Sequence, residues 1–573
     1  MFLKSIYLAA KEIQSKASWR DGAAIALIVI AFSWICYRNL NHPGPYGDEA
    51  WAAAPAVRFV QGQAVIDPTP YHQFHLFGRT FPYMPGDYIG PIQVYVISAF
   101  FAVFGISVPV LRIATSVVGL LGVLAMYFLI RREFGRVAAF FSSLLVATDL
   151  SYVLAVRHDF GVISFGLLAR MLSLFFFLAW IRSRDSLRNL FLSFLVLGLA
   201  VTYRFDYASF IVAALIGMVL FYGLWLRPRI KLQEIGLAVG GFLIGAFPIL
   251  LFNYFTGGQT FQQGRAIGAG TGRGFFPTTL NAVWPFLQLL PEALAKRVTS
   301  LSLLTEGTGG NWILGESVDQ FSPLGPAPIP LAVKIAVPLL LVLVALPHFR
   351  KWRRPLGFLV AIFILTLIFI AATPIAIGPH HILSLYPLPH MLVGLALAGI
   401  WSVAEERPPW LLWTARGAAV IAISWMILTN LTLARAFHHR LIKQGGDAYC
   451  TEAIYELSDQ LKGEYAGKNL VVLDWGFEQP LVILGKDKFK QEVVFWRVLS
   501  EEAPGPWLST MIKNPNNLFL IRAEQFAFKD VIHKRFKEAY SKEKDLVVDE
   551  RKYYRKNGTH VFSVLTFRAQ TSN

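Results

Sequence analysis

Cysteine and charge are both scarce in this sequence. Only two cysteines occur, Cys36 and Cys450, far apart along the chain. That spacing excludes a disulfide framework and a cysteine-pair metal site. Charged residues make up only 16% of the 573 residues, whereas hydrophobic residues make up 55%. With so few charged residues, a water-soluble globular protein could not cover its surface with polar groups, so the composition indicates a membrane protein.

The C-terminal segment, 447–573, carries no Gly-rich phosphate loop, so nothing in it suggests nucleotide binding. The net charge of +17 is compatible with nucleic-acid binding, but its distribution argues against that partner. The basic residues occupy every second short loop, as the positive-inside rule requires of cytoplasmic loops, which predicts a cytoplasmic N-terminus. They are Lys4, Lys11, Lys16 and Arg20, then Arg131, Arg132 and Arg136, then Arg182, Arg184 and Arg188, then Arg227, Arg229 and Lys231, and finally Arg350, Lys351, Arg353 and Arg354.

About eleven apolar stretches are long enough to cross ~30 Å of hydrocarbon as helices. They are 22–37, 108–130, 137–156, 161–181, 190–203, 207–226, 235–255, 331–346, 356–375, 382–400 and 417–433. The predicted fold is therefore a polytopic α-helical membrane domain over residues 1–433. An odd number of spans places the C-terminus on the non-cytoplasmic side.

Three long segments lie outside the predicted spans, all on that same side. The first, 38–107, ends in the apolar stretch 91–105, which would break the charge alternation as a span and is interpreted as an interfacial or re-entrant helix. The second, 256–328, has a helical signal over about 281–300 and is long enough to cover a substrate. The third, 447–573, has short β-branched runs between helical stretches and predicts a soluble α/β domain.

Acidic residues occur at the outer ends of the predicted spans. Asp48 and Glu49 follow the first span, and a carboxylate there can act as a general base, although both also suit the N-terminus of a helix starting near Ala50. Asp159 lies in the next outside turn, where it can cap the fourth span or act in the site. Arg204 and Asp206, in the third turn, are interpreted as a structural ion pair.

A histidine pair, His380 and His381, begins the tenth predicted span. Histidines can bind a metal or a phosphate. Adjacent residues are poorly placed to share one metal ion on a helix face, which favours phosphate contact, and a solvated interfacial pair is an equally simple interpretation.

These features in this order resemble the GT-C superfamily of membrane glycosyltransferases, in the branch of the protein O-mannosyltransferases and lipid A aminoarabinose transferases. The resemblance covers about the first 430 residues. It depends on Gly47-Asp48-Glu49, on 85–105 followed by Leu111-Arg112, on Arg131-Arg132-Glu133-Phe134-Gly135, on Arg157-His158-Asp159, and on Tyr386-Pro387-Leu388-Pro389. Each motif is short, and their fixed order carries the resemblance.

The resemblance implies roles for particular residues. Asp48 matches the catalytic acid of the first loop, with Glu49 beside it, and Asp159 matches a second essential acid. The family's phosphate-binding lysine is absent, because Met84-Pro85-Gly86-Asp87-Tyr88 stands in its place, and Trp51 occupies a position that can be arginine. The donor phosphate must then be bound elsewhere, and the candidates are Arg58, Arg79, Tyr88, His158, Arg204, His380 and His381.

The predicted function is an inverting glycosyltransferase with a polyprenyl-phosphate sugar as donor and a protein, lipid or envelope glycan as acceptor. No cofactor is expected, although a divalent cation bridging Asp48, Asp159 and the phosphate is compatible with the family. The expected location is the inner (plasma) membrane of a bacterium, in contact with membrane lipid. A transporter or flippase is the main alternative, and it would place ionisable residues or broken helices near the bilayer midplane. A non-catalytic scaffold is a third.

Overall fold

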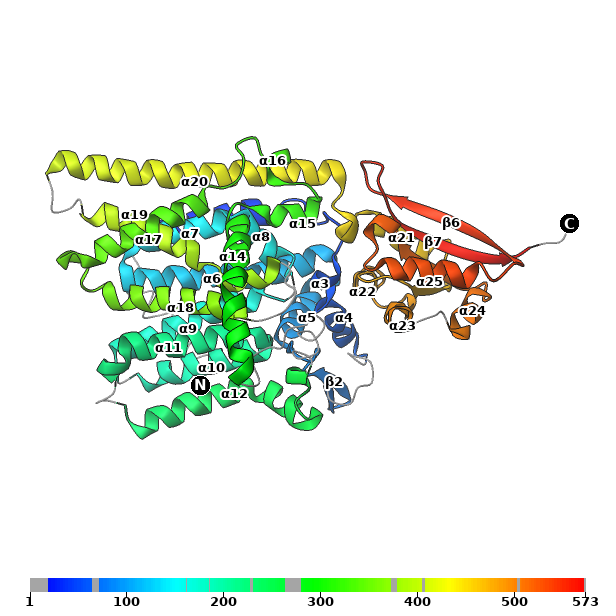
Figure 1. Cartoon of the computed structure of the whole chain (residues 1–573), viewed down its shortest axis with the longest axis horizontal. Helices are drawn as coiled ribbons and strands as arrows, with labels where there is room; N and C mark the ends of the chain where they lie inside the picture. The colour runs from blue at the N-terminus through cyan, green and yellow to red at the C-terminus, as the bar shows by residue number, and fades with distance from the viewer. Residues whose placement is uncertain are drawn as a thin grey trace.

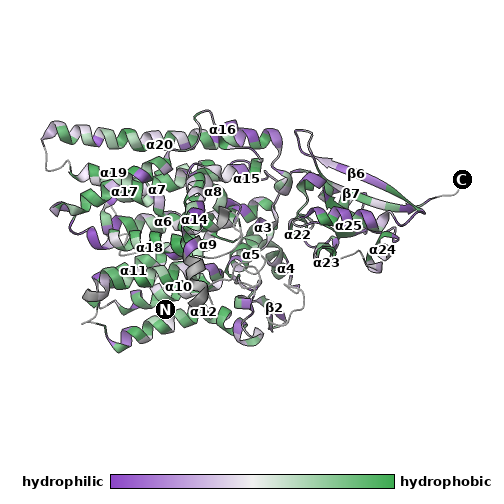
Figure 2. Cartoon of the chain, viewed as in Figure 1, coloured by the Kyte–Doolittle hydropathy of each residue, from purple (hydrophilic) through white to green (hydrophobic). Residues whose placement is uncertain are grey.

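The computed structural model describes residues 19–63, 72–160, 162–184, 186–226, 230–262, 280–372, 379–403, 408–501 and 505–570. It has two parts, a bundle of apolar helices and a C-terminal region built on a β-sheet (Figure 1). Figure 2 shows that hydrophobic residues dominate the helices of the bundle, whereas the C-terminal region has more hydrophilic ones. The predicted fold class, a helical membrane protein followed by an α/β region, is confirmed.

Eight helices in the described ranges are long and apolar enough to cross a membrane. They lie within α2 (Trp19–Cys36), α6 (Val108–Phe134), α9 (Ser164–Arg182), η1 (Phe205–Tyr207) with α11 (Ala208–Leu226), α12 (Leu232–Thr256), α18 (Arg353–Ala372), η4 (Pro379–Leu385) with α19 (Leu388–Val403), and α20 (Pro409–Gln444). Two shorter apolar helices, α10 (Leu187–Tyr203) and α17 (Ile329–Ala345), account for two further predicted spans. The protein is therefore an integral membrane protein.

The remaining predicted span, 137–156, is not one helix. The structure divides it into α7 (Arg136–Thr148) and α8 (Leu150–Arg157), which meet at an angle of 65°. Asp149 lies at the break, and its carboxylate accepts a hydrogen bond from the Tyr152 amide at 2.6 Å. Because this N-cap starts a new helix, the prediction of a single uninterrupted span was wrong.

α20 is much longer than the predicted span inside it. Its 36 residues make a helix ~54 Å long, well beyond the thickness of the hydrocarbon core. It runs along the bundle and ends beside the C-terminal region (Figure 1). α14 (Leu280–Thr305) contains the helix predicted over 281–300 and crosses the direction of the neighbouring helices (Figure 1). The short α15 (Asn311–Leu314) and α16 (Val318–Phe321) follow it.

The first outside segment folds into short elements at the end of the bundle that faces the C-terminal region (Figure 1). They are α3 (Gly47–Ala50), α4 (Ala53–Gln61), the antiparallel strands β1 (Gln73–Leu76) and β2 (Arg79–Pro82), and α5 (Ile92–Phe104). α5 is the helix predicted to lie at the interface over 91–105, and it packs against α4 and α6.

The C-terminal region has a five-stranded mixed sheet in the order β4-β3-β5-β7-β6. The strands are β3 (Asn469–Val472), β4 (Lys490–Val493), β5 (Asn517–Arg522), β6 (Leu546–Tyr554) and β7 (His560–Ala569). Alternation along β3 and β5 gives the sheet two apolar faces. One face packs on α21 (Ala453–Lys462) and α22 (Glu478–Gly485), and the other on α23 (Phe495–Ser500), α24 (Pro506–Ile512) and α25 (Asp530–Tyr540).

Candidate active site

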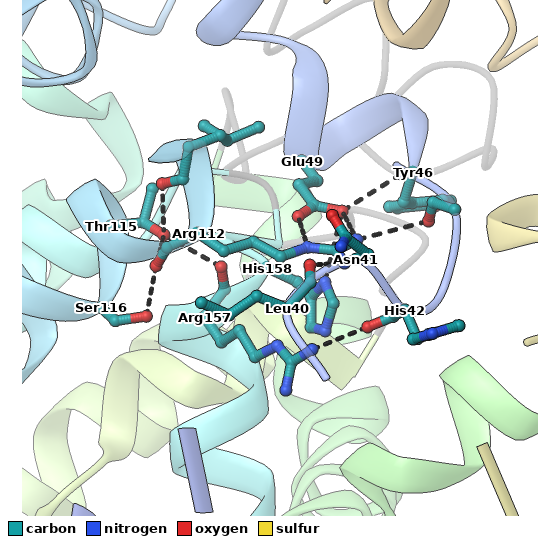
Figure 3. Close-up of polar contacts among 12 residues, drawn as sticks. Leu40, Asn41, His42, Tyr46, Glu49, Arg112, Thr115, Ser116, Arg157 and His158 are labelled. Atoms are coloured by element: carbon teal, nitrogen blue, oxygen red, sulfur yellow. Dashed lines mark hydrogen bonds and ion pairs between the residues drawn. The ribbon is translucent and has the colours of Figure 1, made fainter. Parts of the chain in front are cut away.

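Two buried arginines hold the chain between the first span and α3. The Arg157 guanidinium donates to the carbonyls of residues 36, 38, 39 and 42 at 2.7–3.2 Å. Figure 3 shows the contact with His42. The Arg112 guanidinium donates to the carbonyls of residues 40 and 44 at 2.7 and 3.4 Å. The Thr115 hydroxyl of α6 also donates to the carbonyl of Arg157, the last residue of α8, at 2.9 Å. This hydrogen bond joins α6 to α8. A loop without regular structure is therefore fixed by charged groups of the bundle.

Glu49 belongs to this scaffold. Its side chain is fully buried, Oε1 lies 2.6 Å from Arg112 Nε, and Oε2 lies 3.2 Å from His158 Nδ1 (Figure 3). Oε2 also accepts the Tyr46 amide at 3.2 Å. Burial alone would raise the pKa of Glu49, but the Arg112 charge and the His158 contact outweigh it and lower the pKa to about 2. The sequence predicted Glu49 as a second catalytic acid beside Asp48. In the structure, the Glu49 carboxylate forms an ion pair with Arg112 inside the scaffold.

Asp48, in contrast, keeps part of its side chain exposed. The Tyr46 hydroxyl and the Arg204 charge are both near it. Burial raises the pKa of Asp48, and these two contacts lower it in part. A carboxylate with a raised pKa is a better proton acceptor than an ordinary aspartate, so Asp48 has the properties of a general base.

Asp159 caps α9. Its Oδ1 accepts the amides of Ile163 and Ser164 at 2.9 and 2.8 Å and the Ser164 hydroxyl at 2.6 Å. Burial raises its pKa, whereas these hydrogen bonds and the Arg204 charge lower it. The capping role considered from the sequence is thus present, and the shared influence of Arg204 places Asp159 in the same electrostatic environment as Asp48.

Arg204 is brought to the site by backbone pairing between two distant segments. The Phe205 amide donates to the Tyr88 carbonyl at 2.9 Å, and the Gly90 amide donates to the Tyr203 carbonyl at 3.1 Å. A side chain at Gly90 would lie only 2.2 Å from the carbonyl oxygen of residue 202, so this close approach requires glycine. The Arg204 guanidinium is buried and pairs with Asp206 at 3.1 Å, which agrees with the ion pair expected from the sequence.

Tyr88 shares this environment. Burial raises its pKa, the Arg204 charge lowers it, and the charges of Asp206, Asp48 and Asp87 raise it further. Of the predicted donor-binding residues, Tyr88 and Arg204 are therefore the two that the structure brings to Asp48.

Three other predicted donor-binding residues have different surroundings. His158 is buried beside Glu49 and stacks on Phe160, and burial lowers its pKa to about 3, so it is neutral at physiological pH. Arg58 pairs with Asp487 of the C-terminal region, with Nε 3.0 Å from Oδ2. Arg79 is exposed at the start of β2.

His380 and His381 lie in η4, but their side chains are outside the described part of the chain. Within the described ranges, no group of three or more His, Cys, Asp or Glu side chains is placed to hold a metal ion.

Sequence reasoning missed three contributors to the site. Tyr46 precedes the Gly47-Asp48-Glu49 motif, and nothing in the sequence indicated a role for its hydroxyl. Arg112 and Arg157 belong to motifs used above, but their role as anchors of the loop was not recognised. A signal was available for both, because an arginine within or at the end of an apolar span is costly and usually has a specific partner.

The candidate site is a partly exposed acid with a tyrosine and a buried arginine near it, at the end of the membrane bundle that faces the α/β region (Figure 1). A sequence comparison relates part of this bundle to a known family. Residues 89–252 match the family described as dolichyl-phosphate-mannose-protein mannosyltransferase. No curated protein matches the chain.

Solved structures match almost the whole chain. ArnT from Cupriavidus metallidurans bound to undecaprenyl phosphate has a TM-score of 0.58 at 13% identity, over 96% of this chain and 98% of that one. Its apo structure gives a TM-score of 0.57 over the same shares. The oligosaccharyltransferase AglB from Archaeoglobus fulgidus, in complex with an inhibitory peptide and a dolichol-phosphate, has a TM-score of 0.50 at 13% identity, over 97% of this chain and 75% of that one. The chain therefore has the GT-C fold, and the resemblance to GT-C glycosyltransferases is confirmed.

Proposed function

We propose that this protein transfers a sugar from a polyprenyl-phosphate carrier to a nucleophilic acceptor, with Asp48 as the general base. The observation that carries the proposal is the contrast between adjacent carboxylates. Glu49 is buried and fully engaged by Arg112 and His158, whereas Asp48 is partly exposed and has a raised pKa. A lipid-linked donor is supported by the ArnT and AglB structures of the same fold, which contain undecaprenyl phosphate and a dolichol-phosphate.

The reaction is a single displacement. The Asp48 carboxylate accepts the proton of an acceptor hydroxyl or amine as that atom forms a bond to the anomeric carbon. The bond between this carbon and the phosphate oxygen breaks, and polyprenyl phosphate leaves with the electron pair, so the configuration inverts. The Arg204 guanidinium stabilises the charge that develops on the phosphate, and a charge-assisted contact of this kind is stronger in a partly dry site than in water.

The distribution of charge supports a site on the non-cytoplasmic face. Arg131 and Arg136 both pair with the buried Asp21 at the start of α2, with distances of 2.8 and 3.0 Å. Arg184 pairs with Glu234 at the start of α12 at 2.7 Å. The basic loops thus share the end of the bundle opposite Asp48. By the positive-inside rule this end is cytoplasmic, and the location that we propose is a bacterial plasma membrane.

One feature fits the alternative of a transporter. The broken span α7–α8 has a buried carboxylate, Asp149, at its break, and His390 Nε2 lies 3.1 Å from its Oδ2. The break falls ~20 Å from the start of α7, past the middle of the bilayer. The other oxygen, Oδ1, caps α8. Because both oxygens are engaged by the protein, this pair is assigned a structural role.

The decisive test is sugar transfer by the purified protein in lipid bilayers. Wild type, Asp48→Asn and Asp159→Asn are assayed with a panel of radiolabelled polyprenyl-phosphate sugars and extracted envelope acceptors. Asp459→Asn is the matched control, because that side chain is 77% exposed on α21. Removal of a general base should lower the rate by about 10²–10⁴-fold in Asp48→Asn. Full transfer by Asp48→Asn would refute the assignment of the base, and no transfer by wild type with any donor would favour the transporter.

A further inference from the structure

The C-terminal region lies directly on the helix that carries Asp48. α22 packs beside α3 and α4 (Figure 1). A side chain at Gly47, the first residue of α3, would lie 3.0 Å from the Cα of Gly476 and 3.4 Å from the indole of Trp475. The loop between β3 and α22 is therefore in van der Waals contact with the backbone of the candidate site.

Trp475 of this loop contacts Tyr46, whose hydroxyl is near Asp48. The rings of Trp475 and Tyr46 pack edge to face, with centroids 5.7 Å apart at an angle of 71°. Phe160 packs on Tyr46 in the same way, at 5.8 Å and 74°. Edge-to-face pairs of this kind have a preferred geometry, so the two neighbours restrict the orientation of the Tyr46 ring.

Trp475 is itself held firmly. Arg522, which is only 1% exposed, donates from Nε and Nη2 to the Trp475 carbonyl at 3.2 and 3.1 Å. Its guanidinium lies over the rings of Tyr449 and Phe477, 4.2 and 4.3 Å from their centroids. The Asp474 carboxylate accepts the Trp475 amide at 2.7 Å. The backbone of Trp475 is thus fixed by a charged network inside the C-terminal region, and its ring packs on Tyr449 and Phe528 with centroids 6.2 and 5.8 Å away.

We propose that Trp475 is a positioning residue for the reaction, through which the C-terminal region holds the Tyr46 hydroxyl against Asp48. The inference rests on the proposed function, in which Asp48 is the base. Its consequence is that the C-terminal region takes part in catalysis through the geometry of the base, without touching the reacting atoms.

Docking of the region does not depend on Trp475. Arg58 pairs with Asp487 at 3.0 Å, and the Tyr455 hydroxyl donates to the carbonyl of residue 41 at 2.7 Å. Asp487 follows α22 and Tyr455 lies on α21, and neither contact involves Trp475. A variant at Trp475 should therefore keep the two parts together.

The test is a double-mutant cycle in the transfer assay, with kcat and the donor KM measured for Trp475→Ala, Tyr46→Phe and the double variant. Each single variant should lower kcat about tenfold with the donor KM changed less than about twofold, since only the geometry of the base is affected. In the Tyr46→Phe background, Trp475→Ala should lower kcat by less than about twofold, because no hydroxyl remains to be positioned. Trp475→Phe, which keeps a ring against Tyr46, should recover kcat to within about threefold of wild type.

Trp496→Ala is the matched control, because Trp496 lies in the same region, is 58% exposed and contacts Phe528 instead of Tyr46. It should keep the wild-type kcat. A wild-type kcat in Trp475→Ala, or independent and multiplicative effects in the double variant, would overturn the inference while Asp48→Asn remains inactive. Full transfer by Asp48→Asn would instead overturn the proposed function and this inference with it.

Discussion

Replacing Glu49 by glutamine should weaken the fold far more than it weakens the chemistry. The carboxylate and Arg112 are both fully buried, with 2.6 and 3.0 Å contacts between them. Removing one partner of such a pair leaves an uncompensated buried charge and costs about 3–5 kcal/mol of unfolding free energy. Because Asp48 remains, sugar transfer per folded molecule should fall less than about tenfold, against the larger loss expected for Asp48→Asn.

Thermal unfolding of the purified protein in detergent, followed together with transfer activity, separates the two effects. The double variant Glu49→Gln/Arg112→Gln removes both charges and should be more stable than Glu49→Gln alone. The pKa of Glu49 is lowered from 4.5 to about 2, so the pair stabilises the fold above pH 4.5 and loses this effect as the pH falls towards 2. The unfolding free energies of wild type and Glu49→Gln should therefore converge as the pH falls through that range. An unchanged melting temperature with transfer abolished would refute the reasoning and make Glu49 a catalytic residue.

Three further predictions concern the neighbours of this pair. Tyr46→Phe removes the hydroxyl whose interaction with Asp48 lowers the pKa of that carboxyl, so the acidic limb of the rate profile should move to higher pH; an unmoved limb would exclude this interaction. Arg204→Gln should lower kcat/KM for the donor by about 10–100-fold, as expected for the loss of a charge-assisted contact, and an unchanged kcat/KM would place the phosphate elsewhere. Arg58→Ala should leave the donor KM within about twofold of wild type, because Arg58 pairs with Asp487, and a large rise would restore its predicted phosphate role.

Most of the spanning helices could be predicted because one physical requirement dominates them. Backbone groups inside the hydrocarbon must be hydrogen-bonded within a helix, so apolar runs of sufficient length mark the spans. Hydropathy is an average over many residues, however, and one aspartate inside an apolar stretch changes it little. This is why the break at Asp149, which depends on a single N-cap, was not predicted.

The candidate site was predictable only in part. Asp48 and Asp159 were selected because acids at the outer ends of spans are unusual, and both lie near Arg204. The partner of Arg58 is 429 residues away in sequence, so no local pattern distinguishes a cation that binds phosphate from one that docks a domain. The different roles of Asp48 and Glu49 likewise depend on Arg112, which another helix supplies.

The size of α3 explains why the site needs so many distant partners. A helix of four residues has almost no stability of its own, since isolated helices shorter than about 12–15 residues are marginal in water. The orientation of Asp48 must therefore come from its surroundings. Arg112 holds α3 through Glu49, Arg157 holds the preceding loop, and Trp475 packs on Tyr46. Burying arginine charge in a membrane bundle is costly, and here it fixes the loop of the candidate site, which its own sequence cannot order.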